Sequence, residues 1–171
     1  MEIYVNLAVG DLPRSVDFYR ALGLSFNDQF SDKNAACLVI DPGHINAMLL
    51  VKPFFATFTS KPIVDSSTAT EVILALSADS RAEVDAFAER AVAAGAGVSN
   101  DASDLGFMYT RSFQDPDGHL WEIFWMDPKA ELPEMTEISE TATATATAPA
   151  TTTAPAPAKD AATPLTGHSP S

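Results

Sequence analysis

The stretch that decides the fold is SFQDPDGHLWEIFWM, residues 112–126. Two apolar runs flank a tight turn in this stretch. Pro116 presets φ at the first central turn position and Gly118 tolerates positive φ, so Asp-Pro-Asp-Gly is expected to close a β-hairpin. On the second strand, a period of two places Trp121 on one face and leaves Glu122 on the other as a carboxylate among apolar neighbours. A charge in such a setting needs a partner.

A sharp change in composition near residue 128 divides the chain of 171 residues into two parts. Residues 129–171 hold no aromatic residue and six of the twelve prolines. This Ala/Thr/Pro-rich segment cannot bury enough apolar surface to offset the entropy of ordering, so we expect a low-complexity, disordered tail. Residues 1–128 hold every aromatic residue and have the length of one compact domain.

Charge and cysteine content narrow the partners and the compartment. The net charge of −13 argues against nucleic acid as a partner. No apolar run reaches membrane-spanning length, so no membrane association is expected. The single cysteine, Cys37, excludes an internal disulfide and fits a reducing compartment, and the N-terminus lacks the pattern of a secretory signal. These features together predict a cytoplasmic protein.

The hydrophobic pattern of the first half occurs again in the second half. Residues 2–9 alternate as a half-buried strand does, Asp11 can cap a helix that Gly23 ends, and short apolar segments follow as far as residue 51. From Glu71 the same order returns, with Ser80 beginning the second helix. Each half is therefore predicted to form a βαβββ module.

We expect an α+β fold in which two tandem modules, at about 1–53 and 70–128, form a cup-shaped sheet with one helix outside each module. The period of two predicts which residues line the cup: Tyr4, Asn6, Met48, Ile73, Ala75, Glu122 and Phe124. Between the modules, Phe54, Phe55 and Phe58 either cover a cavity or fill the core. We favour core filling, because large aromatic side chains are usually recruited for buried area.

An ordered set of short motifs in residues 1–128 resembles the vicinal oxygen chelate superfamily, which includes glyoxalase I, bleomycin-resistance proteins, fosfomycin-resistance enzymes and extradiol dioxygenases. The motifs are Val9-Gly10-Asp11-Leu12, Phe18-Tyr19 before Leu22-Gly23, Ala75-Leu76-Ser77-Ala78-Asp79, and Asp115-Pro116-Asp117-Gly118-His119 followed by Glu122. The chain is most similar to the lactoylglutathione lyase-like subgroup. The segments that carry this similarity are Asn34-Ala35-Ala36-Cys37, Gly106-Phe107-Met108-Tyr109, and Trp121-Glu122-Ile123-Phe124-Trp125-Met126-Asp127-Pro128.

The resemblance implies a divalent metal, nickel or zinc, held by four ligands on four strands. Their places in this chain fall on Tyr4, Met48, Ile73 and Glu122. Ile73 has no donor atom and Met48 offers only a soft thioether, whereas such a site needs imidazole or carboxylate donors. Only Glu122 retains a typical ligand, so the resemblance does not by itself establish a metal site.

The partner of Glu122 depends on the register of the hairpin. In one register Arg111 lies across from Glu122, and an ordinary ion pair would satisfy the carboxylate. A one-residue bulge at Gly118 would place Ser112 there instead. His44 and His119 sit beside turns, where we expect them to be only surface or turn residues.

Three functional hypotheses follow. Glu122 could act as a general base beside a carbonyl, in a glyoxalase-type lyase or isomerase acting on a small carbonyl compound or thiol adduct, with Tyr4, Asn6 or Tyr109 positioning the substrate. Alternatively, the cup binds a small molecule of the drug type without chemistry. In the third hypothesis the cup is filled by its own side chains. The resemblance also implies a homodimer.

Overall fold

The structure is a computed structural model, and it describes residues 1–130. Apart from its first two residues, the tail expected at 129–171 lies outside the described residues. Within residues 1–130, no helix is both long and apolar enough to cross a bilayer.

The first module is a four-stranded sheet with one long helix. Its elements are β1 (Ile3–Val9), α1 (Leu12–Ala21), β2 (Ser25–Asn27), the 3₁₀ turn η1 (Asp28–Phe30), β3 (Ala35–Asp41) and β4 (Ile45–Val51). The strand order is β1-β4-β3-β2, with β1 parallel to β4 and the remaining pairs antiparallel. The edge strand β2 ends early because the Asn27 side chain accepts a hydrogen bond from the Gln29 N–H and begins η1.

A crossover joins this module to a second sheet of similar design. It starts with α2 (Lys52–Phe55) and η2 (Ala56–Phe58) and then runs without regular structure to residue 72. The second module contains β5 (Ile73–Ser77), α3 (Arg81–Ala93), β6 (Gly97–Val98), β7 (Ser103–Asp104), β8 (Met108–Gln114) and β9 (Leu120–Met126). Its strand order is β5-β9-β8-β6, β5 runs parallel to β9, and β7 also pairs with β8. The prediction of an α+β fold with a repeated module is confirmed.

Both long helices begin where the sequence predicts. The Asp11 carboxylate accepts a hydrogen bond from the Arg14 N–H at 3.1 Å, and Ser80 Oγ accepts one from the Glu83 N–H at 3.2 Å. The Glu83 carboxylate in turn accepts from the Asp79 N–H at 2.8 Å, one residue before the cap. These bonds satisfy amide groups that lack a partner within the helix.

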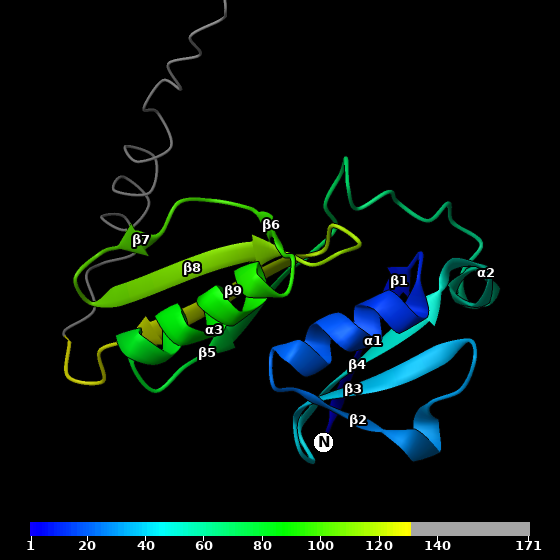
Figure 1. Cartoon of the computed structure of the whole chain (residues 1–171), viewed down its shortest axis with the longest axis horizontal. Coiled ribbons are helices and arrows are strands. Elements are labelled where there is room, and N and C mark those ends of the chain that lie inside the picture. The colour runs from blue at the N-terminus through cyan, green and yellow to red at the C-terminus, as the bar shows by residue number, and fades with distance from the viewer. Residues whose placement is uncertain (131–171) are drawn as a thin grey trace, which may run out of the picture. The chain divides into compact units, whose positions relative to one another are not determined.

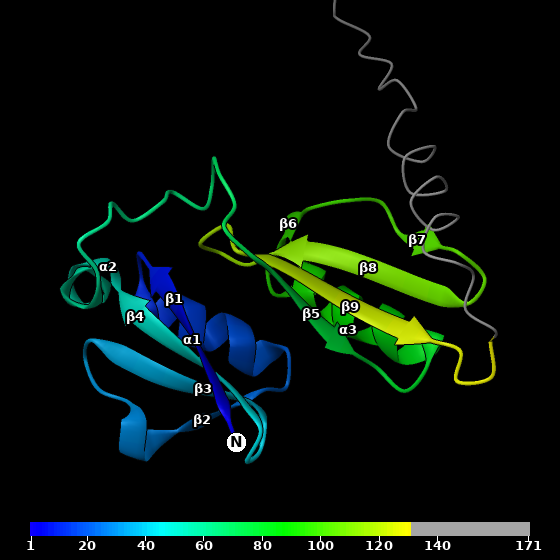
Figure 2. The same ribbon diagram turned by 180° about the vertical axis from the view of Figure 1, so that it is seen from behind.

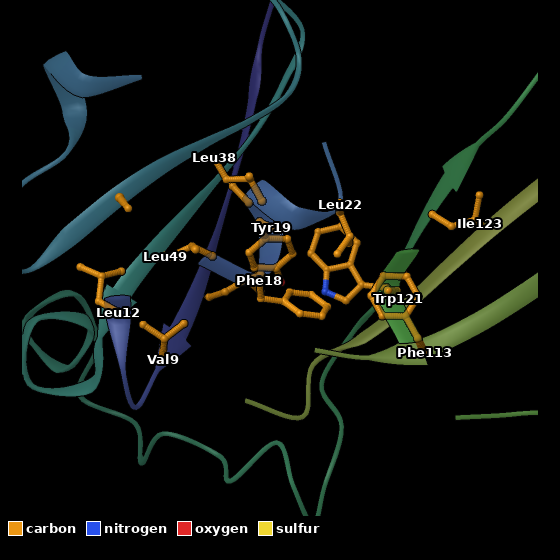
Figure 3. Close-up of a cluster of buried hydrophobic side chains, with 14 of the residues drawn as sticks. Val9, Leu12, Phe18, Tyr19, Leu22, Leu38, Leu49, Phe113, Trp121 and Ile123 are labelled. Atoms are coloured by element: carbon orange, nitrogen blue, oxygen red, sulfur yellow. The ribbon is translucent and has the colours of Figure 1, made fainter. Parts of the chain in front are cut away.

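Figures 1 and 2 show α1 and α3 on the same side of the two sheets, so the other face of each sheet carries no helix. The alternate residues that point towards the helices form one core shared by both modules. In this core Tyr19 of α1 meets Trp121 of β9 at 5.7 Å between ring centroids, and Phe18 meets Phe113 at 6.2 Å (Figure 3). Burial of these aromatic rings joins the two modules into one unit.

The turn between β8 and β9 sets the hairpin register. The Asp115 N–H donates to the His119 carbonyl at 3.0 Å, which leaves a three-residue loop, and Gly118 takes the positive φ of 90° that such a bulged turn needs. Ser112 therefore pairs with Glu122, and Arg111 pairs with Ile123. Of the two registers predicted from the sequence, the structure has the one that separates Arg111 from Glu122.

The three phenylalanines of the crossover do not fill the core. Phe58 is 68% exposed, and Phe54 and Phe55 are half-buried. The preference for core filling was wrong, because the core is already closed by the aromatic residues of α1, β8 and β9.

Candidate functional site

Glu122 lies in the middle of β9 on the face of the second sheet that no helix covers. The alternation along β9 produces this orientation, because Trp121 and Ile123 on either side point into the core. The strand neighbours of Glu122 are Ser112 on β8 and Ala75 on β5. Its side chain is half-buried, and no hydrogen bond or ion pair from residues 1–130 reaches the carboxylate. Glu122 can therefore contact a molecule at that face.

Tyr109 and Arg111, which the sequence placed near Glu122, belong to the other face. The Tyr109 hydroxyl donates to the Asp85 carboxylate of α3 at 2.8 Å, and the Arg111 guanidinium donates to the same carboxylate at 3.1 Å. The hydrogen bond to Asp85 is the main reason why the pKa of Tyr109 is raised, followed by desolvation. Both side chains hold α3 against β8, and neither shares a face with Glu122.

The four positions that correspond to metal ligands in glyoxalase I fall on two separate sheets. Tyr4 and Met48 lie on β1 and β4, and Ile73 and Glu122 lie on β5 and β9. The Tyr4 hydroxyl donates to the Glu2 carboxylate at 2.9 Å, which is the main cause of the raised pKa of Tyr4. Within residues 1–130, no three His, Cys, Asp or Glu side chains lie close enough to hold a metal ion. These donors do not fit a nickel or zinc site.

A pocket of about 760 Å³ lies beside β1, under the crossover between the modules. One wall is the edge of β1, and the other wall is the crossover. The lining residues are Val5, Asn6, Leu7, Ala8, Phe55, Thr59, Lys61, Pro62, Ile63, Val64, Ser66, Thr70, Glu71, Val72 and His119. The volume falls in the range of small-molecule sites, and most of the wall is apolar with a few polar groups, as such sites usually are. Among the predicted site residues, only Asn6 lines this pocket.

The β8–β9 turn closes one end of the pocket. His119 Nε2 lies 3.0 Å from the carbonyl oxygen of Ala8 at the end of β1. The crossover packs so closely on the turn that a Cβ atom at Gly118 would lie 2.7 Å from the Ser66 carbonyl oxygen. His119 therefore lies at the turn, as expected, and in addition it contacts β1 and lines the pocket.

Two carboxylates of the same turn bind it to the first module. Asp117 accepts hydrogen bonds from the Gly10 N–H at 2.8 Å, from Ser15 Oγ at 2.7 Å and from the Arg14 guanidinium at 3.0 Å. The Tyr19 hydroxyl donates to Asp115 at 2.5 Å, and the pKa of Tyr19 is raised well above its ordinary value by desolvation and by the Asp115 charge. The turn thus fixes β1, α1 and the crossover relative to one another.

The sequence did not reveal most of the pocket. Lys61 and Glu71 lie in a segment without periodicity, and only the tertiary structure brings them near His119. The useful signal was the crossover itself, because an aromatic segment that is too polar for a core strand is a candidate wall for a cavity. Of the two interpretations of its phenylalanines, covering a cavity agrees with the structure for Phe55, which lines the pocket.

The sequence matches the family model described as Glyoxalase/Bleomycin resistance protein/Dioxygenase superfamily over residues 3–123. This match spans both modules and the turn between β8 and β9. The chain belongs to this superfamily. The resemblance of the short sequence motifs and the observed fold therefore indicate the same superfamily.

Several solved structures share the fold. A glyoxalase-related enzyme from Fulvimarina pelagi has a TM-score of 0.64 at 22% identity, covering 78% of this chain and 93% of its own. The hypothetical protein SA1046 from S. aureus has a TM-score of 0.63 at 24% identity, covering 73% and 93%. The fosfomycin resistance protein FosX from Mesorhizobium loti has a TM-score of 0.54 at 15% identity, covering 75% and 93%. At these identities the likeness concerns the fold alone, and function must be argued from the site. No curated protein matches the sequence.

Proposed function

We propose that this glyoxalase-superfamily domain binds a small organic molecule in the pocket beside β1. The observation that carries the proposal is the pocket of about 760 Å³ between the edge of β1 and the crossover. Val5, Phe55 and Ile63 supply apolar wall, and Lys61 and Glu71 supply one charge of each sign. A ligand with an apolar body and a polar or charged end would match these groups.

A screen by thermal shift, followed by calorimetry, tests this proposal. Probes should include hydrophobic amines, aromatic carboxylates and cationic glycopeptides. Ligands of the pocket should raise the melting temperature, and Phe55→Ala should weaken them, because Phe55 supplies part of the wall. Phe58→Ala is the matched control, since Phe58 is 68% exposed and does not line the pocket. A flat response across the panel would contradict the proposal.

A lyase or isomerase of the lactoylglutathione lyase type is the second candidate. It is supported by Glu122, a half-buried carboxylate that residues 1–130 leave without a hydrogen bond. A general base beside a carbonyl compound needs such an available carboxylate. Tyr4, Met48 and Ile73 do not provide the donors of a metal site, so the proposed role of Glu122 is that of a base.

Turnover of methylglyoxal with glutathione tests the second candidate. The assay should be run alone and with added nickel or zinc. Turnover that Glu122→Gln abolishes would support a lyase. Ligand binding in the pocket without turnover, and without any effect of Glu122→Gln, would leave the binding function as the better account.

We further propose a homodimer that forms at the free edge of β5. β5 is the outer strand of its sheet, and its first residue, Ile73, is 51% exposed. Two copies related by a two-fold axis can pair such edges with each other, which removes exposed amide groups from water. In light scattering after gel filtration, Ile73→Lys should convert a dimer to a monomer. A monomeric parent protein would refute this assembly.

A cytoplasmic location remains a prediction. Cys37 is buried, and desolvation raises the pKa of its thiol, so Cys37 is suited to packing and not to disulfide exchange. This agrees with a reducing compartment.

A further inference from the structure

Two opposite charges line the pocket beside β1 without pairing with each other. They are Lys61 and Glu71, and within residues 1–130 neither side chain forms an ion pair or a hydrogen bond. Both residues are exposed, so water alone can solvate either charge. Their shared position in one largely apolar cavity of about 760 Å³ is what indicates a ligand.

The two other charges of the crossover behave differently. Lys52 and Asp65 do not line the pocket, and they are close enough for the charge of Lys52 to act on Asp65. Hydrogen bonds from Ser67 are the main reason why the pKa of Asp65 is lowered, and the positive charge of Lys52 contributes in the same direction. The crossover therefore compensates its charges outside the pocket and leaves one charge of each sign uncompensated inside it.

His119 contributes a hydrogen-bond acceptor to the same pocket. β5 runs parallel to β9 with Ile73 opposite Leu120, so the residues that precede β5 run alongside the turn that carries His119. The Ala8 carbonyl can only accept, so His119 Nε2 carries the hydrogen of their contact at 3.0 Å. Nδ1 of the neutral imidazole is then an acceptor, and no group of residues 1–130 bonds to it. A carboxylate and an imidazole nitrogen are both suited to an ammonium group.

We infer that the ligand of this pocket is a zwitterion with an apolar body, such as a free apolar amino acid. Its ammonium binds Glu71 and His119 Nδ1, and its carboxylate binds Lys61. Its body packs against Phe55 and Ile63. A simple amine would leave Lys61 without a partner, and a simple carboxylate would leave Glu71 without one. This inference rests on the proposed binding function and names the class of its ligand.

The first test compares probes that share one phenyl ring, on the unmodified full-length protein. L-Phenylalanine and 4-(aminomethyl)benzoate are zwitterions, with the two charges close together in the first and at opposite ends of the ring in the second. 2-Phenylethylamine carries only the positive charge, and 3-phenylpropionate carries only the negative one. In calorimetry at low, constant ionic strength, at least one zwitterion should bind about fivefold more tightly than both single-charge probes, because it gains a second ion pair.

The second test removes the charges one at a time. Lys61→Gln should weaken the better zwitterion and 3-phenylpropionate but spare 2-phenylethylamine. Glu71→Gln should weaken the same zwitterion and 2-phenylethylamine but spare 3-phenylpropionate. Each loss of affinity should be roughly three- to fivefold. Lys33→Gln and Glu89→Gln are the matched controls, because they make the same chemical changes at exposed positions outside the pocket, and they should leave every affinity within about twofold.

The outcomes separate this inference from the proposed function. Zwitterions that bind no better than the single-charge probes would overturn the inference, and so would losses that do not follow the sign of the removed charge. If Phe55→Ala still weakens the probes in that case, the pocket binds small molecules and only the ligand class is wrong. If neither these probes nor the wider panel binds, the proposed function is refuted as well. The comparison on the unmodified protein does not depend on the folding of any variant.

Discussion

Asp117 is an example of a single side chain whose contacts reach across the two modules. Its carboxylate is 6% exposed and accepts from a backbone amide, a buried hydroxyl and a guanidinium. Asp117→Ala leaves the Gly10 N–H without this acceptor and should lower the free energy of unfolding by about 2–3 kcal/mol. Arg14→Ala should cost less than about 1 kcal/mol, because Arg14 is half exposed. Urea denaturation measures both, and equal losses would contradict this account.

Gly118 is a position where adding a single methyl group should destabilise the protein. It has a φ of 90°, and an added Cβ would meet the Ser66 carbonyl oxygen at 2.7 Å. Gly43 has a similar φ of 78° but open space around it, so Gly43→Ala should cost only the backbone term of about 1 kcal/mol. Gly118→Ala should cost clearly more, because the crossover must also move. Comparing the melting temperatures of the two variants separates the cost of the positive φ, which both share, from the cost of the steric clash with Ser66, which only Gly118→Ala has.

Tyr19 should make stability depend on alkaline pH. Burial and the Asp115 charge raise its pKa well above the ordinary value of 10.0, so the folded state holds the neutral phenol. Its contribution to stability is complete below pH 10 and is lost as pH rises through the pKa of the folded state. In a phenolate absorbance titration, Tyr19 should ionise only when the protein unfolds. Tyr19→Phe should remove the ionisation that accompanies unfolding. If that ionisation persists in the variant, it does not belong to Tyr19.

At the scale of elements, the N-terminus of α3 offers a direct test of capping. Ser80→Ala should destabilise the protein by about 1 kcal/mol, because the Glu83 N–H loses its acceptor. Ser80→Asp keeps an acceptor and should retain most of the stability. Chemical denaturation of the pair distinguishes the cap from a general effect of substitution, since a cap effect is restored by aspartate and a packing effect is not.

The elements themselves could be predicted because their signals are local. Asp11 and Ser80 begin helices, Gly23 and Gly95 follow them with positive φ, and alternation marks β1 and β9. The candidate site could not be predicted in this way. The strand register at Glu122 depends on a one-residue bulge in the turn. Arg111 forms an ion pair with Asp85 of α3, and no sequence pattern indicated that this helix packs against Arg111. The pocket is formed by segments far apart in the chain, so no local pattern describes it.

At the scale of the whole domain, the shared core predicts that both modules unfold together. Phe18 and Tyr19 of the first module pack on Phe113 and Trp121 of the second, so neither module keeps its buried surface alone (Figure 3). Near-ultraviolet and far-ultraviolet circular dichroism should therefore give one coincident transition in urea. Two separated transitions would show that the modules are independent.

The β8–β9 turn also has a consequence for the time course of folding. Its hydrogen bonds to Gly10 and Ser15 and its contact with Ala8 join residues that are 102–111 positions apart in sequence. During synthesis, the first module must leave the ribosome long before Asp117 is made. Contacts of such high sequence separation close late and slow folding. The first module therefore cannot complete its contacts until the last hairpin of the domain has been made. In that interval the nascent chain is most exposed to chaperone binding and to proteolysis.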